Sequence, residues 1–249
     1  MGFYHTASAT VRVPVAVSAC LAGLPVRYDG RDRPIPGEIA AWLQAELHLI
    51  PVCPEIDAGL GVPRPPVQLV MSANGSPPRA LGRDDPSLDV SHALRRNALR
   101  SARQLRSQHI CGYIWKSRSP SCGLGSTPLF DAAGTAAGLT SGLQARLFRK
   151  RMPWLVQCED EDLETLQDAK RFAWQCRLVF DVMTTRGAEL PALHRHYRTL
   201  TEIFSEREQH ALDCIAQMGR RKHYLSALRD ACLNAPGDAL RQAMTASIR

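Results

Sequence analysis

The sequence predicts an α/β protein in which a domain with a parallel, Rossmann-like sheet (residues 1–159) precedes an all-α domain (residues 160–249). Three observations support this prediction. In the first part, short apolar runs rich in β-branched residues alternate with segments of helical spacing. Loops rich in Gly, Pro and Asp separate these segments. Beyond about residue 160 the strand pattern stops and helical spacing remains, which is typical of a helical domain.

The elements of the first domain follow in chain order. Strands are expected at the apolar runs 13–21, 49–53, 109–116 and 154–159. Helices are expected at 37–48, 91–108 and 138–150, with Ser91 as the N-cap of the second helix. The prolines within 59–70 predict a rigid extended loop, and 72–89 is polar and turn-rich. Strands that alternate with helices in this way favour a parallel sheet.

The C-terminal domain is predicted to consist of helices alone. A long helix is expected over 161–187, closed by Gly187, and two more within 190–232, with a shorter one towards the end. The segment 219–224, with His194, His196 and Tyr197, is a second possible contact set in this domain. Its histidines are interpreted mainly as surface or capping residues rather than metal ligands.

The net charge of +7 is unevenly distributed. Residues 1–159 contain 18 Lys and Arg against 11 Asp and Glu, whereas residues 160–249 contain 13 of each. The helix at 91–108 collects five arginines on one face, opposite its apolar face: Arg95, Arg96, Arg100, Arg103 and Arg106. This face is either solvated or a phosphate-contacting stripe, and Arg96, Arg100 and Arg103 are the candidate RNA-binding residues.

The apolar runs are too short to cross a membrane, and the first residues lack the apolar segment of a secretory signal. We therefore expect a cytoplasmic protein whose cysteines are reduced, bound to metal or buried, rather than joined in disulfides. No C-x-x-C pair occurs, so a zinc ribbon or finger has no support.

The eight cysteines fall into two groups. Five lie inside predicted strands or amphipathic helices and are expected only to pack: Cys111, Cys158, Cys176, Cys214 and Cys232. Cys20, Cys53 and Cys122 lie at or just after strand ends, beside Gly and Pro residues. Ligands of parallel sheets bind at these ends. Three thiolates there could hold zinc or an iron–sulfur cluster, although packing remains the alternative.

Four motifs resemble, in order and spacing, those of the bacterial thiouracil desulfidase family. They are VSACLAGLPVRYDG, PVCPE, GLGVPRPP and WKSRSPSCG, and together they span about residues 13–159. The resemblance implies a [4Fe–4S] cluster bound by Cys20, Cys53 and Cys122, with the fourth iron open to the sulfur of a thiolated pyrimidine. It also implies that Glu55 is the catalytic glutamate and that the catalytic serine lies in the SPSC stretch.

We assign that serine to Ser119, with Ser121 as the second choice, and expect Ser121 and Lys116 to contact the substrate. In this hypothesis the open iron polarises the C=S bond and Glu55 activates water, so that hydrosulfide leaves without net redox change. The family usually has a cysteine before R-Y-D-G, where this chain has Pro25 and Val26. This departure bears on substrate selectivity rather than on the ligands.

Some desulfidases of this kind act on free thiouracil as single domains, whereas others carry a C-terminal helical extension and resemble enzymes that act on 4-thiouridine in transfer RNA. With the basic first domain, this resemblance implies 4-thiouridine in transfer RNA as the substrate, with free thiouracil or a thionucleoside as the alternative. A base in folded RNA would have to be flipped out to reach the cluster. A hypothesis of another class is a non-enzymatic RNA-binding protein with a structural metal site.

Overall fold

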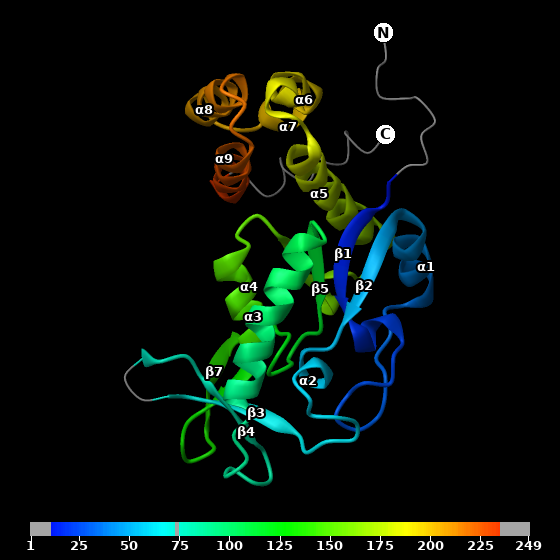
Figure 1. The fold of residues 1–249 in the computed structure, drawn as a ribbon, viewed down its shortest axis with the longest axis vertical. Helices are drawn as coiled ribbons and strands as arrows, with labels where there is room; N and C mark the ends of the chain where they lie inside the picture. The colour runs from blue at the N-terminus through cyan, green and yellow to red at the C-terminus, as the bar shows by residue number, and fades with distance from the viewer. Residues whose placement is uncertain (1–10, 73–74, 235–249) are drawn as a thin grey trace.

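The computed structural model describes residues 11–72 and 75–234. It contains two four-stranded sheets, called sheet A and sheet B, and a set of C-terminal helices (Figure 1). Helices α6 to α9 lie at one end of the molecule and sheet B at the other (Figure 1). The predicted class, a parallel α/β sheet followed by helices, is confirmed.

Sheet A is the predicted parallel sheet. Its strands are β1 (Val13–Ser18), β2 (Leu47–Val52), β5 (Gly112–Trp115) and β8 (Val156–Glu159), in the order β2-β1-β5-β8. All neighbouring pairs run parallel. The chain leaves β1 towards β2 on one side and later pairs β5 on the other. This makes β1 the switch point, where open α/β sheets bind ligands at the carboxyl ends of their strands.

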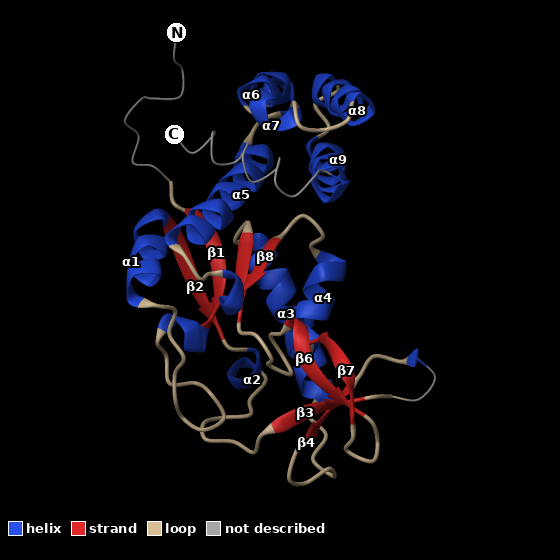
Figure 2. Cartoon of the chain, turned by 180° about the vertical axis from the view of Figure 1, so that it is seen from behind, coloured by secondary structure: helices blue, strands red, loops and turns tan. Residues whose placement is uncertain are grey.

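Helices cover both faces of sheet A (Figure 2). The helices are α1 (Gly37–Glu46) and α5 (Leu166–Thr184) on one face, and α3 (Ser91–Ser107) and α4 (Leu143–Arg151) on the other. The strands show why: Val13, Val15 and Val17 of β1 pack towards α1 and α5, whereas Ala16 packs with residues of α3 and α4. Alternate residues of a strand face opposite sides, so apolar residues at every position bury both faces.

Sheet B was not predicted. Its strands are β3 (Val67–Val70), β4 (Arg79–Gly82), β6 (Leu124–Phe130) and β7 (Ala136–Ser141), in the order β4-β3-β6-β7. The expected extended loop at 59–70 and turn-rich segment at 72–89 thus contain β3 and β4. The expected helix at 138–150 is wrong in its first part: β7 pairs with β6 in an antiparallel ladder, and the helix begins only at Leu143.

The expected N-cap of α3 is also wrong. The hydroxyl of Ser91 accepts a hydrogen bond from the Ala80 N–H (2.8 Å), so it ties the helix to β4 instead of capping it. The carboxylate of Asp89 accepts from the Ser91 N–H (2.9 Å) and takes over part of the capping. The predicted segregation of α3 is confirmed, because Leu94, Ala98, Ala102 and Leu105 are buried and most of the arginines are exposed.

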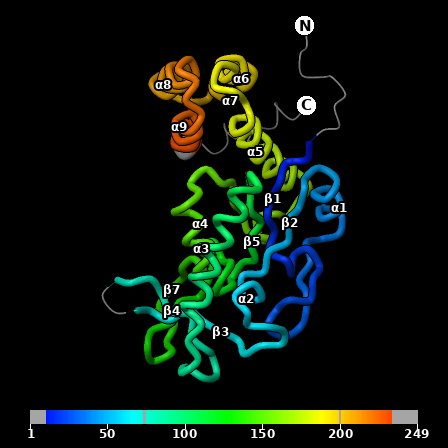
Figure 3. The backbone as a smooth tube through the Cα atoms, in the orientation of Figure 1, coloured from blue at the N-terminus to red at the C-terminus, as the bar shows by residue number. Residues whose placement is uncertain are grey.

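The remaining C-terminal helices are α6 (Leu190–His196), α7 (Arg198–Thr201), α8 (Glu206–Gln217) and α9 (Arg221–Asn234). Figure 3 shows the chain leaving sheet A through α5 to reach them. His194 joins three of these helices: Nδ1 contacts the Tyr224 hydroxyl and Nε2 the Asp213 carboxylate, both at 2.8 Å. This bridge is a structural role. The short helix expected towards the chain end lies outside the described residues.

No helix in the described part of the chain is both long and apolar enough to cross a membrane.

Candidate active site

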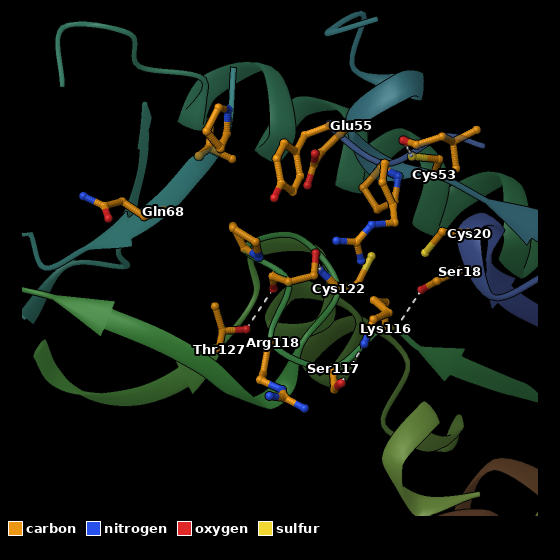
Figure 4. A pocket seen from close by; sticks show the side chains of 18 of the residues that line it. Ser18, Cys20, Cys53, Glu55, Gln68, Lys116, Ser117, Arg118, Cys122 and Thr127 are labelled. Atoms are coloured by element: carbon orange, nitrogen blue, oxygen red, sulfur yellow. Dashed lines mark hydrogen bonds between the residues drawn. The ribbon is translucent and has the colours of Figure 1, made fainter. Parts of the chain in front are cut away.

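A pocket of about 470 Å³ lies where the carboxyl ends of β1, β2 and β5 meet sheet B. Residues of β3 and β6 form its apolar wall, with Val67, Leu69 and Phe130 among them. Cys20, Cys53 and Cys122 line the same pocket, and Figure 4 shows their sulfur atoms around a common space. Three cysteines that are far apart in sequence therefore converge because the strands before them are neighbours in sheet A.

Short turns hold Cys20 and Cys53 at this edge. Cys20 lies in a 3₁₀ turn, Ala19–Ala22, which follows β1 directly. Gly23 ends that turn with a φ of 84°, a left-handed conformation that favours glycine. Cys53 precedes the short helix α2 (Pro54–Asp57), with Pro54 in its first turn. Its thiol is 3.8 Å from the Val26 carbonyl oxygen, which brings the loop after β1 against it.

Cys122 sits on the Ser/Pro/Gly loop that follows β5. The loop is anchored to the start of α4, where the Leu143 N–H donates to the Pro120 carbonyl (2.9 Å). A Cβ atom at Gly142 would come within 2.6 Å of the backbone of Ser121. Only glycine permits this close approach, so the rigid position of the third cysteine depends on a residue 20 positions later in the sequence.

The three thiols share an environment that disfavours free thiolates. Burial, followed by the neighbouring Cys53, raises the pKa of Cys20 to about 11. Burial also raises the pKa of the Cys53 thiol and, more strongly, that of Cys122. A positively charged metal group replaces these protons when it binds, so metal binding here is coupled to proton release.

The thiolates that Cys20, Cys53 and Cys122 can form are ligands of zinc and of iron–sulfur clusters alike. Within the described residues, no group of three His, Cys, Asp or Glu side chains is placed to hold a metal ion. In an iron–sulfur cluster each cysteine binds a different iron, so the thiolates surround a larger group. Soft thiolate ligands also match iron–sulfur chemistry.

Glu55 lies on α2, two residues after Cys53, and is held from both sides. Arg64 donates to Oε2 through Nε and is also within 2.7 Å of it through its terminal nitrogen. Ser121 donates its hydroxyl to Oε1 at 3.0 Å. The side chains of Glu55 and Arg64 are only 12% and 6% exposed, so this is a buried ion pair. Such a pair fixes the carboxylate in one orientation.

Ser119 and Ser121 have different partners. The Ser119 hydroxyl accepts hydrogen bonds from the N–H groups of Ser121 (3.3 Å) and Cys122 (3.2 Å) and therefore shapes the loop. The Ser121 hydroxyl bonds to Glu55. Ser119 lines the pocket, and Ser121 is almost completely buried. Of the two serines, Ser121 is the one in contact with the glutamate.

Lys116 lines the pocket at the end of β5 and forms a second buried pair. Its ammonium group donates to Asp160 (2.7 Å) and to the Ser117 hydroxyl (2.8 Å). Both side chains of the ion pair are less than one-fifth exposed. Burial opposes ionisation of Asp160, but the hydrogen bonds from Lys116 and Ser117 prevail and lower the pKa of its carboxyl group.

The α3 arginines lie outside this pocket. Arg95 donates to the carbonyls of Pro77 and Pro78, and Arg100 donates to the Asp57 carbonyl of α2 (2.5 Å). Arg96 and Arg103 are exposed. Of the candidate RNA-binding residues, Arg100 thus has a structural contact close to the pocket.

Sequence reasoning missed Arg64 and Asp160. Arg64 lies in a proline-rich segment that was interpreted only as a rigid loop. Its place as a single cation between two prolines could have marked it as a candidate site residue. Asp160 follows β8 directly, and its position at a carboxyl strand end was such a signal too.

The five other cysteines are free thiols. Cys111 and Cys176 are fully buried in the core between sheet A and α5, as expected for packing residues. Cys158 and Cys232 are partly buried against the same core, whereas Cys214 is half-buried near His210.

A family model and a solved structure point to the same family. The 2-thiouracil desulfurase family matches residues 15–160, which is more than half of the chain. The uncharacterized protein YbbK of Bacillus subtilis (strain 168) is 29% identical over 146 residues, covering 55% of this chain and 89% of YbbK. The structure of TudS, a [4Fe–4S]-dependent thiouracil desulfidase, matches with a TM-score of 0.50 and 28% identity, over 61% of this chain and 93% of TudS. The resemblance found in the motifs is therefore confirmed, and the chain belongs to the 2-thiouracil desulfurase family.

Proposed function

We propose that this chain is a [4Fe–4S]-dependent desulfidase that converts 4-thiouridine in RNA, with transfer RNA as the expected substrate, to uridine. The observation that carries the proposal is the shared pocket: three cysteines and a fixed carboxylate face one space of nucleobase-compatible size. The balanced reaction adds water to the C=S carbon and releases hydrosulfide and a proton, so no oxidant or reductant is consumed.

Cys20, Cys53 and Cys122 would hold the cluster. When bound, a cluster with three protein ligands supplies a Lewis-acidic iron that can take the soft sulfur of a thiocarbonyl group and polarise the C=S bond. The chain's own residues then supply the proton chemistry around the thiolated carbon.

Glu55 is the proposed general base, and its hydrogen bonds indicate which oxygen acts. A carboxylate oxygen has two lone pairs. Arg64 occupies Oε2 with two nitrogens, whereas Ser121 occupies Oε1 with one hydroxyl. Oε1 therefore keeps a lone pair that can accept a proton of the attacking water. Until the carboxylate takes this proton, Arg64 stabilises its negative charge.

Lys116 and the serines are proposed to orient the substrate. Two of the three ammonium donors of Lys116 are used by Asp160 and Ser117, which leaves one for a carbonyl oxygen of the pyrimidine. Glu55 can return the proton from Oε1 towards the leaving sulfur or the product, while Ser121 holds this oxygen in place and Ser119 keeps the loop in shape.

The RNA part of the proposal is supported by the charge of the first domain and by the exposed arginines Arg96 and Arg103 on α3. Free thiouracil is the second candidate substrate, because the similar structure TudS is a thiouracil desulfidase.

The test is Glu55→Gln in anaerobically reconstituted protein, assayed on 4-thiouridine-containing transfer RNA and on free 4-thiouracil. We expect turnover to fall by about 10²- to 10⁴-fold while iron and sulfide content stay unchanged. Full activity of the variant would remove Glu55 from the mechanism. An unmodified protein that binds the RNA and a metal without desulfurating either substrate would instead favour a non-enzymatic RNA-binding protein.

A further inference from the structure

A second pocket, of about 440 Å³, lies where the first domain meets the C-terminal helices. We call it the junction pocket. Its walls come from the C-terminal end of α3 and the residues after it, from the segment before β8, and from α5 and α9. Figure 2 shows α9 next to the loop that joins α4 to β8. None of its lining residues belongs to the cysteine pocket.

The junction pocket is lined by positive charge. Its cationic side chains are Arg106, Arg221, Lys222 and Arg229, and the described lining residues include no carboxylate. Arg229 bonds to the adjacent Asp230, but these side chains are 41% and 56% exposed, so the pair contributes little. Lys222 is exposed and has no ion pair with any described residue. A cavity whose charges have one sign attracts a ligand of the opposite sign.

The position of one of these cations is fixed without being neutralised. Arg221 donates to the carbonyl oxygens of Met183 (2.7 Å) and Thr185 (2.8 Å) at the end of α5. Carbonyl groups orient the guanidinium group but leave its net charge in place. The first turn of α9 is thereby tied to α5, and it presents its positive charge at a defined place.

The same pocket has an aromatic wall. Trp154 lines it, and the guanidinium carbon of Arg106 lies over the indole ring, 5.4 Å from the ring centroid. Pro153 and Leu225 add apolar surface. Unstacked bases of single-stranded RNA stack on aromatic rings and on arginine guanidinium planes. A planar base with an attached phosphate uses both the apolar wall and the cations, whereas a bare inorganic anion would use the cations alone.

His109 lines the junction pocket from a strained backbone position. It follows the end of α3 with a φ of 55°, the left-handed conformation that glycine usually supplies after a helix. A residue with a Cβ atom pays a conformational cost there. A strained residue at the edge of a cavity is typical of a side chain that has a role in binding.

The junction pocket and the cysteine pocket lie at opposite ends of sheet A. His109 and Trp154 precede β5 and β8, whereas Lys116 follows β5 and lines the cysteine pocket. At about 3.3 Å per residue, the extended stretch from His109 to Lys116 is roughly 20 Å long. One mononucleotide cannot fill both pockets, but an RNA chain can reach both. The exposed Arg103 shares a helix face with Arg106 and continues the positive charge along α3.

We propose that the junction pocket binds an unstacked nucleotide of the RNA substrate, at a position in the RNA away from the thiolated base. The base stacks on the pair formed by Trp154 and Arg106, and its phosphate groups contact Lys222 and Arg229. This inference rests on the proposed action on RNA and adds a second contact site to it. The affinity for RNA is then set in part at the end of the sheet where no reaction occurs.

The test measures binding of non-thiolated transfer RNA to reconstituted protein and to the double variant Lys222→Ala/Arg229→Ala. We expect the affinity to fall about 10-fold and the slope of log affinity against log salt to fall by about 2. On thiolated transfer RNA, KM should rise with kcat unchanged. Turnover of free 4-thiouracil should change by less than about 2-fold, because this substrate does not reach the junction pocket.

Trp154→Phe locates the bound base. In the unmodified protein, RNA binding should quench part of the tryptophan fluorescence. The phenylalanine variant keeps an aromatic ring, so its RNA affinity should stay within about 3-fold while that part of the quenching disappears. Quenching that persists unchanged in this variant would place the base elsewhere and overturn the proposal.

Arg220→Ala is the matched control for the double variant. Arg220 is exposed and adjacent to Arg221, but it does not line the junction pocket. An affinity loss in this control as large as that of the double variant would indicate a long-range field instead of a binding site. RNA affinity that is unchanged in the double variant would also overturn the proposal.

Two further outcomes separate the possible ligands and the two proposals. Uridine 5′-monophosphate that binds through Lys222 and Arg229, with RNA affinity independent of them, would make the pocket a site for free nucleotides and overturn the RNA assignment. RNA binding that depends on these residues, in a protein that desulfurates no thiolated substrate, would support the junction pocket while the proposed reaction fails.

Discussion

The pocket is lined by two pairs of cationic side chains that differ in how their charge is neutralised: Arg64 and Lys116, which we call the floor, and Arg33 and Arg83, which we call the rim. On the floor, Arg64 and Lys116 are buried and paired with carboxylates at 2.7 Å. On the rim, Arg33 and Arg83 are exposed and nearly unpaired. A buried charge has to be neutralised within the protein because water cannot reach it, whereas an exposed charge stays available to a ligand. The charges of Arg64 and Lys116 are therefore neutralised within the protein, whereas those of Arg33 and Arg83 stay accessible to solvent.

The strongest way to break this contrast is to remove Arg64. Arg64→Ala leaves the Glu55 carboxylate buried without its partner, and it also removes the bonds to the carbonyls of Val26 and Gly61. We expect the free energy of unfolding to fall by about 3 kcal/mol and kcat by at least 10²-fold. Chemical denaturation and single-turnover desulfuration measure the two effects.

Arg64→Lys and Arg79→Ala serve as controls for Arg64. The lysine keeps the charge but lacks the fork, so stability should recover more than turnover. Arg79 pairs with Asp89 at the surface, where the two side chains are 52% and 36% exposed, so its loss should cost only about 1 kcal/mol or less. Equal costs at Arg64 and Arg79 would contradict the distinction between buried and exposed pairs.

The two loop serines sharpen the comparison within the floor. Ser121→Ala removes the hydrogen bond to Glu55, so we expect about a 10-fold loss of kcat and a changed pH–rate profile. Ser119→Ala removes a hydroxyl that accepts two loop N–H groups, so it should lower the free energy of unfolding by about 1 kcal/mol. A larger loss of kcat in Ser119→Ala at full cluster content would reverse these roles.

A smaller effect is expected on the α3 face. Arg96→Ala and Arg103→Ala each should weaken transfer RNA binding about 3-fold at moderate salt and reduce the slope of log affinity against log salt by about 1. The neighbouring exposed residue provides a neutral control, Gln104→Ala, which should leave the slope unchanged. Unchanged slopes in both arginine variants would mean that the face is merely solvated. Anisotropy titrations over a salt series give these slopes.

An effect of similarly small size concerns Asp89, a carboxylate that is partly exposed and already has hydrogen-bond partners. Burial opposes its ionisation, but hydrogen bonds from Ser91 and then Arg79 prevail and lower its pKa to about 2. The ionised form therefore stabilises the folded protein above the usual carboxyl pKa of about 4, and this stabilisation is lost as the pH falls towards 2. Because the side chain is about one-third exposed, we expect Asp89→Asn to cost only about 1 kcal/mol at pH 7.

The pH dependence supplies the check on Asp89. The difference in unfolding free energy between Asp89→Asn and the unmodified protein should shrink steadily between about pH 4 and pH 2. A difference that stays constant with pH would show that the asparagine acts through lost packing or capping alone.

The central strands β1 and β5 of sheet A were predictable because they are buried on both faces, which leaves continuous apolar runs in the sequence. Sheet B was not predictable, because its strands are partly exposed. In β7 four of six residues are exposed, and glycine, threonine and serine give no alternating pattern. What holds β7 in place is its pairing with β6, a tertiary contact that no local pattern encodes.

The residues of the site also differ in whether a local sequence pattern or only a tertiary contact reveals them. The three cysteines were found because each follows a strand or a recognisable motif. Arg64 was missed because its significance arises only when the proline-rich loop folds back onto α2 and meets Glu55. The sequence displays a residue's type, whereas its partner depends on how two distant segments pack.

The packing of α5 has a practical meaning for anyone who wishes to shorten this protein. The family similarity ends at residue 160, but the apolar core does not: Phe172 and Cys176 of α5 pack against Gly112 at the start of β5. Cutting the gene at the edge of the similarity would expose the part of sheet A that α5 covers, which α1 alone does not bury, and leave it prone to aggregation. The family match thus ends at residue 160, before the end of the segment that packs on sheet A. We expect a stable shortened protein to need the whole of α5, which ends at Thr184.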